Sequence, residues 1–201
     1  MRTELMHGAW LELFESWLAP EPAEQLRSDL VRELRWEQRH IVLFGKPVLQ
    51  PRLIAWAGEL PYRYSGQTLE PRPWPASLSG ALAEIGARVS AASGALFNHV
   101  LVNRYRDGKD SMGYHADAEP ELGPDPVIAT LSLGETRRFL LRAQRRAPRE
   151  RAQSLPLASG SLLVMGGTCQ RHYRHAIARD PETPLGERLS LTFRRLLAAP
   201  R

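Results

Sequence analysis

Two segments of the chain space their hydrophobic residues like amphipathic helices. The first covers residues 1–35, where apolar positions recur every three or four residues: Trp10, Leu13, Phe14 and Trp17, and then the run from 23 to 34. The second covers residues 76–92 and carries one aliphatic stripe: Leu78, Leu82, Ile85 and Val89. These spacings predict two helical regions, separated by a proline-rich stretch of short strands and loops at residues 51–75.

The remaining hydrophobic segments are short, alternating or wholly apolar, and bounded by turn residues, which is typical of β-strands. They cover residues 97–105, 127–133, 138–142, 160–165 and 189–196. Helices followed by many strands favour an α+β fold whose second half is a sandwich or a barrel. The arginine-rich segment 144–154 is predicted to be an exposed loop between strands.

Composition is that of an ordinary globular domain with a basic surface. The 201 residues are 43% hydrophobic and 24% charged, with a formal net charge of +5 and a pI near 9.9. Almost all of the basic excess is arginine, since Lys46 and Lys109 are the only lysines. Because guanidinium groups suit phosphate and carboxylate, this favours an anionic partner such as nucleic acid; a plain compositional bias towards arginine is the alternative.

Cysteine content and hydropathy indicate the cellular compartment in which the protein is expected. Cys169 is the only cysteine, which excludes an internal disulfide and a zinc site built from cysteines. No stretch approaches the roughly 18 consecutive apolar residues of a membrane-spanning helix, and the N-terminus does not follow the pattern of a signal peptide. We therefore expect one cytoplasmic domain with no membrane partner.

The candidate chemistry begins with the runs GYHADAEPE and RHYRHAI, which contain His115, Asp117 and His175. On an extended backbone, residues two apart point to the same side, so His115 and Asp117 can reach one ion. Two imidazoles and one carboxylate can occupy one face of Fe(II) and leave positions open for a co-substrate and O₂. The alternative is a pair of exposed loop residues and a histidine buried in the core.

The C-terminal run ERLSLTFRRL separates into two faces. One face is apolar, with Leu189, Leu191 and Phe193, and the other is polar, with Arg188, Ser190, Thr192 and Arg194. Two arginines on one strand face are expected to meet an anion the size of a small dicarboxylate; solvated arginines at a barrel edge are the alternative. Asn103 and Tyr105 share a face of an earlier predicted strand and add an amide and a phenol as donors.

Four runs together carry a family resemblance: NRYRDGKDSMGYHADAE, LPLASGSLLVMGG, HYRHAI and ERLSLTFRRL. They resemble the AlkB family of Fe(II)/2-oxoglutarate-dependent dioxygenases, in its nucleic-acid demethylase branch. The resemblance covers about residues 40–197. It implies one domain over residues 1–201, with N-terminal helices and a nucleotide-recognition segment in residues 1–95. A double-stranded β-helix (jelly-roll) core is implied for residues 96–198.

The resemblance also implies catalytic roles. His115, Asp117 and His175 would hold the iron, while His172 competes with His175 for the third position and fits the family register less well. Six residues would bind 2-oxoglutarate. They are Arg188 at the distal carboxylate with Tyr105 and Ser190 assisting, Asn103 and Arg194 near the iron-bound end, and Thr192 in the same pocket.

The nucleotide side is implied by GELPYRYSG, which resembles the family's recognition segment. Tyr64 would stack on a flipped base, with His115 facing the other side of that base, and Tyr62 would contact the nucleic-acid backbone or a base edge. Glu119 lies where the family places an acidic contact to an exocyclic amine.

The resemblance implies further contacts between the protein and the nucleic-acid strands. Phe44 resembles a hydrophobic finger that is inserted into the base stack, with a buried strand residue as the alternative. Arg52 and Lys46 would contact phosphates. A further basic patch or a solvated loop is formed by Arg145, Arg146, Arg149 and Arg151. Two residues depart from the more polar ones of duplex-acting relatives and leave the strand preference open: Ala116 and Ala118.

The function implied is oxidative demethylation of N-alkylated bases in DNA, such as 1-methyladenine or 3-methylcytosine. The reaction would use Fe(II), 2-oxoglutarate and O₂ and release formaldehyde and succinate. We expect a monomer whose partner is alkylated DNA. The alternatives are a related oxygenase acting on RNA or protein, and a nucleic-acid-binding module without turnover.

Overall fold

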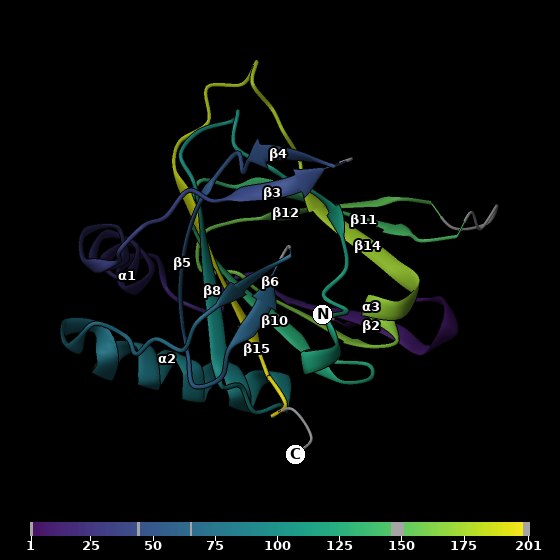
Figure 1. The fold of residues 1–201 in the computed structure, drawn as a ribbon, viewed down its shortest axis with the longest axis horizontal. Coiled ribbons are helices and arrows are strands. Elements are labelled where there is room, and N and C mark those ends of the chain that lie inside the picture. Colours follow the sequence, from purple (N-terminus) through teal and green to yellow (C-terminus); the bar gives the residue numbers. More distant parts are fainter. Residues whose placement is uncertain (1, 44, 65, 146–150, 199–201) are drawn as a thin grey trace.

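The fold consists of two antiparallel β-sheets that face each other, with helices on the outside (Figure 1). The computed structural model describes residues 2–43, 45–64, 66–145 and 151–198. Within these residues the larger sheet has seven strands, which from edge to edge are β1 (Arg2–Glu4), β2 (Ala9–Phe14), β13 (Leu162–Gly167), β10 (Ile128–Gly134), β15 (Arg188–Arg194), β8 (His99–Tyr105) and β5 (Leu53–Gly58).

A smaller sheet and two hairpins supply the other strands of the described residues. The smaller sheet has four strands, in the order β12 (Gln153–Leu157), β11 (Arg137–Ala143), β14 (Tyr173–Ile177) and β9 (Met112–His115). The hairpins are β3 (His40–Leu43) with β4 (Lys46–Leu49), and β6 (Tyr62–Tyr64) with β7 (Gln67–Leu69). Helices outside two facing sheets confirm the predicted α+β jelly-roll.

Two long helices cover the outer face of the larger sheet: α1 (Pro20–Glu33) and α2 (Ala76–Ser93). The stripe predicted for the second helix is the buried one, because Leu78, Leu82, Ile85 and Val89 join a hydrophobic cluster with the outward-facing residues of β8, β10 and β15. Gly94 ends α2 in the left-handed conformation, with φ of 67°. Among the described residues, no helix is long and apolar enough to cross a membrane.

The prediction of helix over residues 1–35 was wrong in its first half. Residues 9–14 form β2, which pairs with β1 and β13 inside the larger sheet. The helical spacing of Trp10, Leu13 and Phe14 in this strand is coincidental. Trp10 instead lies across Gly166 of β13, where a Cβ atom would come within 2.1 Å of the indole ring. Residues 1–95 thus contain both long helices, as expected, and also β1, β2 and β5 of the main sheet, which were not expected there.

The space between the sheets holds a second cluster, which draws side chains from both. Leu163 and Met165 of β13 meet Phe139 and Leu141 of β11 there, with Tyr173 of β14. The predicted strands 127–133, 138–142, 160–165 and 189–196 correspond to β10, β11, β13 and β15 with small shifts at the ends. The short elements are the 3₁₀ turns η1 (Met6–Gly8) and η2 (Pro120–Leu122), and helix α3 (Cys169–His172).

Candidate metal and dicarboxylate site

Three candidate metal ligands meet between the sheets. His115 ends β9 and is the direct cross-strand partner of His175 in β14, while Asp117 lies two residues beyond the end of β9. One ligand atom from each residue lies within 4.8 Å of the others. The two imidazole rings are 4.2 Å apart between centroids, and His115 Nε2 is 3.9 Å from Asp117 Oδ1. This is the donor set that Fe(II) oxygenases use, and its third member, His175, lies 58 residues after Asp117 in the sequence.

Neighbouring groups fix the orientation of each ligand side chain. The Nδ1 of His115 lies 2.9 Å from the Gly113 carbonyl, so Nδ1 carries the proton and Nε2 keeps its lone pair. Asp117 Oδ2 accepts from Arg194 Nη2 at 3.0 Å, which leaves Oδ1 towards the histidines. The ring of Phe139 stacks on His175 at 5.4 Å between centroids. These contacts hold the three donors in place before any ion arrives.

The pKa values of the three residues suit metal binding. Burial lowers the pKa of His175 to about 3, with His115 adding repulsion, and burial also lowers the pKa of His115. Burial works to raise the pKa of Asp117, but Arg194 and the two histidines outweigh it and hold this pKa at about 2. Near neutral pH the cluster therefore offers two neutral imidazoles and one carboxylate, which are the protonation states a cation requires.

The polar face of β15 lies beside this cluster. All four residues of this face line a narrow cavity: Arg188, Ser190, Thr192 and Arg194. The same cavity is lined by Asn103, Tyr105, His115 and His175. Direct pairing of β15 with β8 places Arg188 opposite Tyr105 and Ser190 opposite Asn103. The alternation read from the sequence thus holds across the whole strand, with its leucines in the outer cluster.

Arg188 is a buried cation without a counter-ion in the described part of the chain. Its side chain is 0% exposed, and Nη2 donates to Ser132 Oγ at 2.9 Å, but Nε and Nη1 have no hydrogen-bond partner there. Burial lowers the pKa of Arg188 to about 10. Since an unpaired buried guanidinium is costly, the arrangement fits a carboxylate that binds between Arg188 and the cluster.

The candidate nucleotide-side residues are less open than expected. Tyr62 is 0% exposed and Tyr64 is 4% exposed, both packed in a third hydrophobic cluster, so no free stacking face is seen at Tyr64 in this arrangement. Glu119 is half-buried, and its Oε2 has no partner within the described residues. Burial and the neighbouring Asp117 raise the pKa of Glu119.

The expected phosphate contact at Arg52 is wrong for this arrangement. Arg52 is 4% exposed, and its donors are directed inward to Asn103, Tyr64 and the Ser111 carbonyl. The reason is its position between β4 and β5, where the chain turns into the sheet beneath the β6–β7 hairpin. A buried guanidinium whose donors are directed inward cannot reach a phosphate at the surface.

The other expected residues lie as follows. Lys46 is exposed on β4. His172 is outside the metal cluster and packs on His7, with ring centroids 4.7 Å apart. Arg145 and Arg151 are exposed, while the remaining candidates lie outside the described residues: Phe44, Arg146 and Arg149.

Gln170 is a contact that the sequence did not reveal. It is 2% exposed on α3, and its Oε1 accepts from the backbone N–H of Asp117 at 2.9 Å. Gln170 therefore ties the loop of Asp117 to the helix that leads into His175. No local pattern marks it, because the two partners are 53 residues apart.

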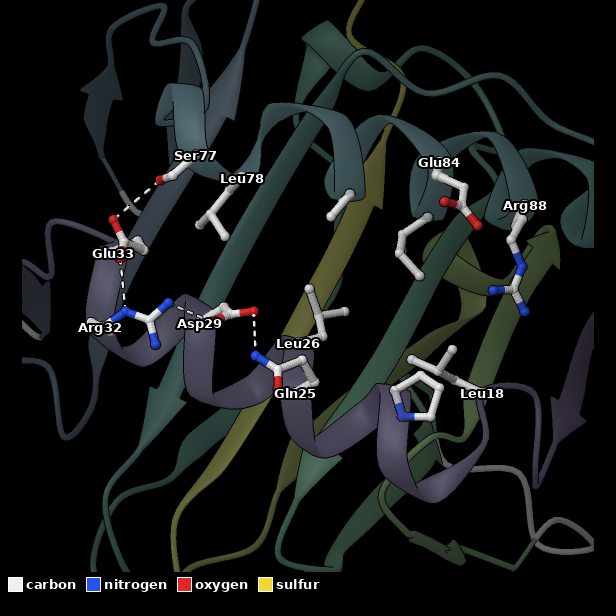
Figure 2. A pocket seen from close by; sticks show the side chains of 13 residues that line it. Leu18, Gln25, Leu26, Asp29, Arg32, Glu33, Ser77, Leu78, Glu84 and Arg88 are labelled. Carbon is white, nitrogen blue, oxygen red and sulfur yellow. Dashed lines mark hydrogen bonds and ion pairs between the residues drawn. The ribbon is translucent and has the colours of Figure 1, made fainter.

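A larger hollow lies on the opposite side of the larger sheet, between α1 and α2 (Figure 2). Its volume is 330 Å³ and its apolar floor includes Leu18, Leu26 and Leu78. Its charged rim is satisfied internally, since Arg32 pairs with Asp29 at 2.5 Å and Glu33 accepts from Ser77 at 3.1 Å. This groove is a helix–helix contact, and Asp29, Arg32 and Glu33 on its rim are ion-paired with one another.

Comparison with known proteins agrees with this geometry. A model of the 2OG-Fe(II) oxygenase superfamily matches residues 11–194. The "Alpha-ketoglutarate-dependent dioxygenase alkB homolog 3" of Rattus norvegicus is 36% identical over 94% of this chain and 65% of its own length. The "DNA oxidative demethylase ALKBH2" of Homo sapiens is 37% identical over 98% of this chain and 76% of its own length. This chain thus spans slightly less than two thirds of the rat relative.

A solved structure also shares the fold. The structure of OsALKBH1 is similar with a TM-score of 0.66 at 19% identity, covering 97% of this chain and 100% of that chain. A likeness at this identity speaks for the fold alone.

Proposed function

Because this chain belongs to the AlkB family of 2OG-Fe(II) oxygenases, we propose that it is a demethylase that repairs N-alkylated bases in DNA. The observation that carries the proposal is the pairing of two features in one cavity. A cluster of two histidines and one aspartate lies beside a buried arginine with two unpaired donor nitrogens. Iron and a dicarboxylate together account for both.

The residues present fit the iron. His115, Asp117 and His175 would hold it, with Arg194, Gln170 and Gly113 orienting them. When bound, iron with 2-oxoglutarate and O₂ supplies the oxidising power needed to hydroxylate an N-methyl group. The hydroxymethyl product breaks down to formaldehyde and the repaired base, while 2-oxoglutarate leaves as succinate and CO₂.

The polar face of β15 would bind the co-substrate. Arg188 has two donor nitrogens free for the distal carboxylate. Its guanidinium lies over the ring of Tyr105, which is only 1% exposed, so this end of the cavity is closed to water. Ser190, Thr192 and Asn103 line the path from Arg188 to the metal ligands. Because these side chains belong to central strands, the dicarboxylate would be held in one orientation.

Glu119 supports a cationic base as the substrate. It lies two residues after Asp117, and its Oε2 is without a hydrogen-bond partner among the described residues. Bases such as 1-methyladenine and 3-methylcytosine carry a positive charge, so a carboxylate can pair with the ring or its exocyclic amine. The basic composition of the chain favours the nucleic-acid backbone in the same way.

Formaldehyde release tests the function. Oligonucleotides with one 3-methylcytosine, as single-stranded DNA, duplex DNA and RNA, are incubated with Fe(II) and 2-oxoglutarate, and formaldehyde and succinate are both measured. We expect about one formaldehyde per succinate with DNA, and neither product above background with His115→Ala. Succinate without formaldehyde on every nucleic acid would overturn the demethylase, because 2-oxoglutarate would then decay without oxidising any methylated base, while release from RNA alone would reassign the nucleic acid.

A further inference from the structure

Arg52 lies where three parts of the site meet. Its Nε donates to Asn103 Oδ1 at 2.8 Å, Nη2 donates to the Tyr64 hydroxyl at 2.5 Å, and Nη1 donates to the Ser111 carbonyl at 3.2 Å. Asn103 lines the dicarboxylate cavity, and Tyr64 belongs to the β6–β7 hairpin. Ser111 is the residue directly before β9. One side chain therefore touches the co-substrate side, the candidate nucleotide side and the strand of His115.

The chemistry of guanidinium makes these contacts directional. Arginine has five N–H donors and no acceptor, so any group bonded to it must present an acceptor. An amide can present either its oxygen or its NH₂, and Arg52 selects the oxygen of Asn103. The NH₂ is then the group that Asn103 has left for the cavity it lines. Likewise the Tyr64 oxygen accepts from Arg52, which frees its own proton for another acceptor.

Arg52 is a costly residue to bury at this place. Arg52 is 4% exposed, and within the described residues its hydrogen bonds go to three neutral acceptors, the side chains of Asn103 and Tyr64 and the Ser111 carbonyl. A buried cation held only by neutral groups is costly, and a neutral donor or an apolar residue would fill this place more cheaply. Burial works to lower the pKa of Arg52, but Tyr64, Tyr105 and Asp110 outweigh it and raise this pKa, so Asp110 offsets part of the cost. A dicarboxylate in the cavity behind Asn103 would offset more of it.

We propose that Arg52 is a positioning residue that orients the Asn103 amide nitrogen and the Tyr64 hydroxyl proton away from itself as donors. In this way it couples the arrangement of the co-substrate cavity to that of the β6–β7 hairpin. The inference rests on the proposed function for the identity of the dicarboxylate. Arg52 touches neither substrate itself. Its effect on 2-oxoglutarate binding passes through Asn103.

Co-substrate binding without turnover tests this role. The dissociation constant for 2-oxoglutarate is measured by calorimetry on the Mn(II)-loaded protein, for wild type, Arg52→Met, Arg52→Lys and Arg63→Met. Arg63 is exposed on β6 of the same hairpin and is the matched control. We expect binding to weaken at least about tenfold in Arg52→Met, the loss of a hydrogen bond to a charged group. Arg52→Lys should lie in between, and Arg63→Met should match wild type.

A double-mutant cycle separates positioning from general support of the fold. If Arg52 acts through Asn103, then Arg52→Lys weakens binding in the wild type but adds nothing to Asn103→Ala. In the wild type bound to 2-oxoglutarate, the Asn103 side-chain NH₂ signal in ¹⁵N NMR should also shift, and Arg52→Lys should reduce that shift.

Three results would overturn the proposal or its basis. Additive effects in the cycle, or equal binding in Arg52→Met and Arg63→Met, would overturn the positioning role even if the melting temperature fell. Wild-type protein that binds no 2-oxoglutarate would overturn this role and the proposed function together. Normal co-substrate binding without demethylation of any oligonucleotide would overturn the proposed function alone and leave Arg52 in place.

Discussion

The two halves of the candidate site are built on different supports. Most of the metal and dicarboxylate half stands on β8, β14 and β15, each of which pairs along its whole length with a neighbouring strand of the two main sheets. His115 ends the edge strand β9, and Asp117 follows that strand. The nucleotide half stands on a three-residue hairpin strand and the segment after Asp117. The first half presents unpaired donors towards a cavity, while the second has its tyrosines packed into a hydrophobic cluster.

We expect this difference to separate binding of the proposed co-substrate from binding of the proposed base. Strands fixed on both sides hold polar groups in place before a ligand arrives, so the cost of ordering is already met. A short hairpin with buried aromatic rings would have to rearrange before a base could stack on Tyr64. Changes in the first half should therefore affect every reaction of the protein, and changes in the second only those that include the base.

The largest effect is expected at the metal cluster. His115→Ala removes one ligand atom and should lower 2-oxoglutarate turnover by at least about a thousandfold, since the remaining two donors hold the ion weakly. Mn(II) binding by calorimetry should fall in parallel. The matched control is His172→Ala, which removes the histidine that packs on His7 outside the cluster. Equal loss in the two variants would contradict the ligand assignment.

A split between stability and binding is expected at Arg188. Arg188→Met removes a buried charge that has two unpaired nitrogens, so the protein without co-substrate should be as stable or more stable in thermal unfolding. Binding of 2-oxoglutarate should nevertheless weaken about a hundredfold, because the distal carboxylate loses two charge-assisted hydrogen bonds.

Arg174→Met on the exposed face of β14 is the control for Arg188→Met and should change neither quantity. A fall in stability with unchanged co-substrate binding would reverse the interpretation and make Arg188 a structural residue.

The first half could be predicted from the sequence because its signal is local. Alternation along residues 188–194 separates polar from apolar faces, and pairing of whole strands carries that order into space. The same logic failed at residues 9–14, where Trp10 and its neighbours have helical spacing but Leu11 pairs with Met165 in the sheet. Pairing with a strand about 150 residues later in the chain outweighed the helical spacing of the hydrophobic residues there.

The second half could not be predicted because its contacts depend on burial. Arg52 looks like a surface cation in the sequence, yet the turn into β5 directs it to Asn103 and Tyr64. Gln170 carries no signal at all, since only the packing of α3 brings it to the backbone of Asp117. Side chains that connect distant segments are visible once the fold is known, and such side chains link the two halves of this site.

A change confined to the nucleotide half is expected at Glu119. Glu119→Gln should lower kcat/KM for a cationic methylated base about tenfold, the effect of about 1.4 kcal/mol of lost attraction. Decay of 2-oxoglutarate without a base should stay unchanged. Glu121→Gln, two residues further along, is the control and should leave both rates unaltered. Equal losses with and without a base would place Glu119 in the co-substrate half instead.

The smallest effect is expected in the pH dependence of folding stability, through His99 at the start of β8 beside Tyr62. His99 is 2% exposed, its ring contacts Tyr62 edge-on at 4.9 Å, and burial together with Arg194 lowers its pKa to about 3. The unfolded chain takes up this proton near pH 6.5, before the folded protein does. His99 therefore contributes stability that is complete at neutral pH and is lost as the pH falls from about 6.5 towards 3.

Each pH unit in that window costs up to about 1.4 kcal/mol for one such group, and His115 and His175 act in the same direction. His99→Phe should remove one of the three contributions, so the free energy of unfolding, measured with urea at pH 7.0 and 5.5, should fall less steeply than in wild type. An unchanged slope would mean that His99 takes up its proton at the same pH in the folded protein as in the unfolded chain. The end of β8 beneath the hairpin would then be open to water rather than packed, and the nucleotide half would be looser than its buried tyrosines indicate.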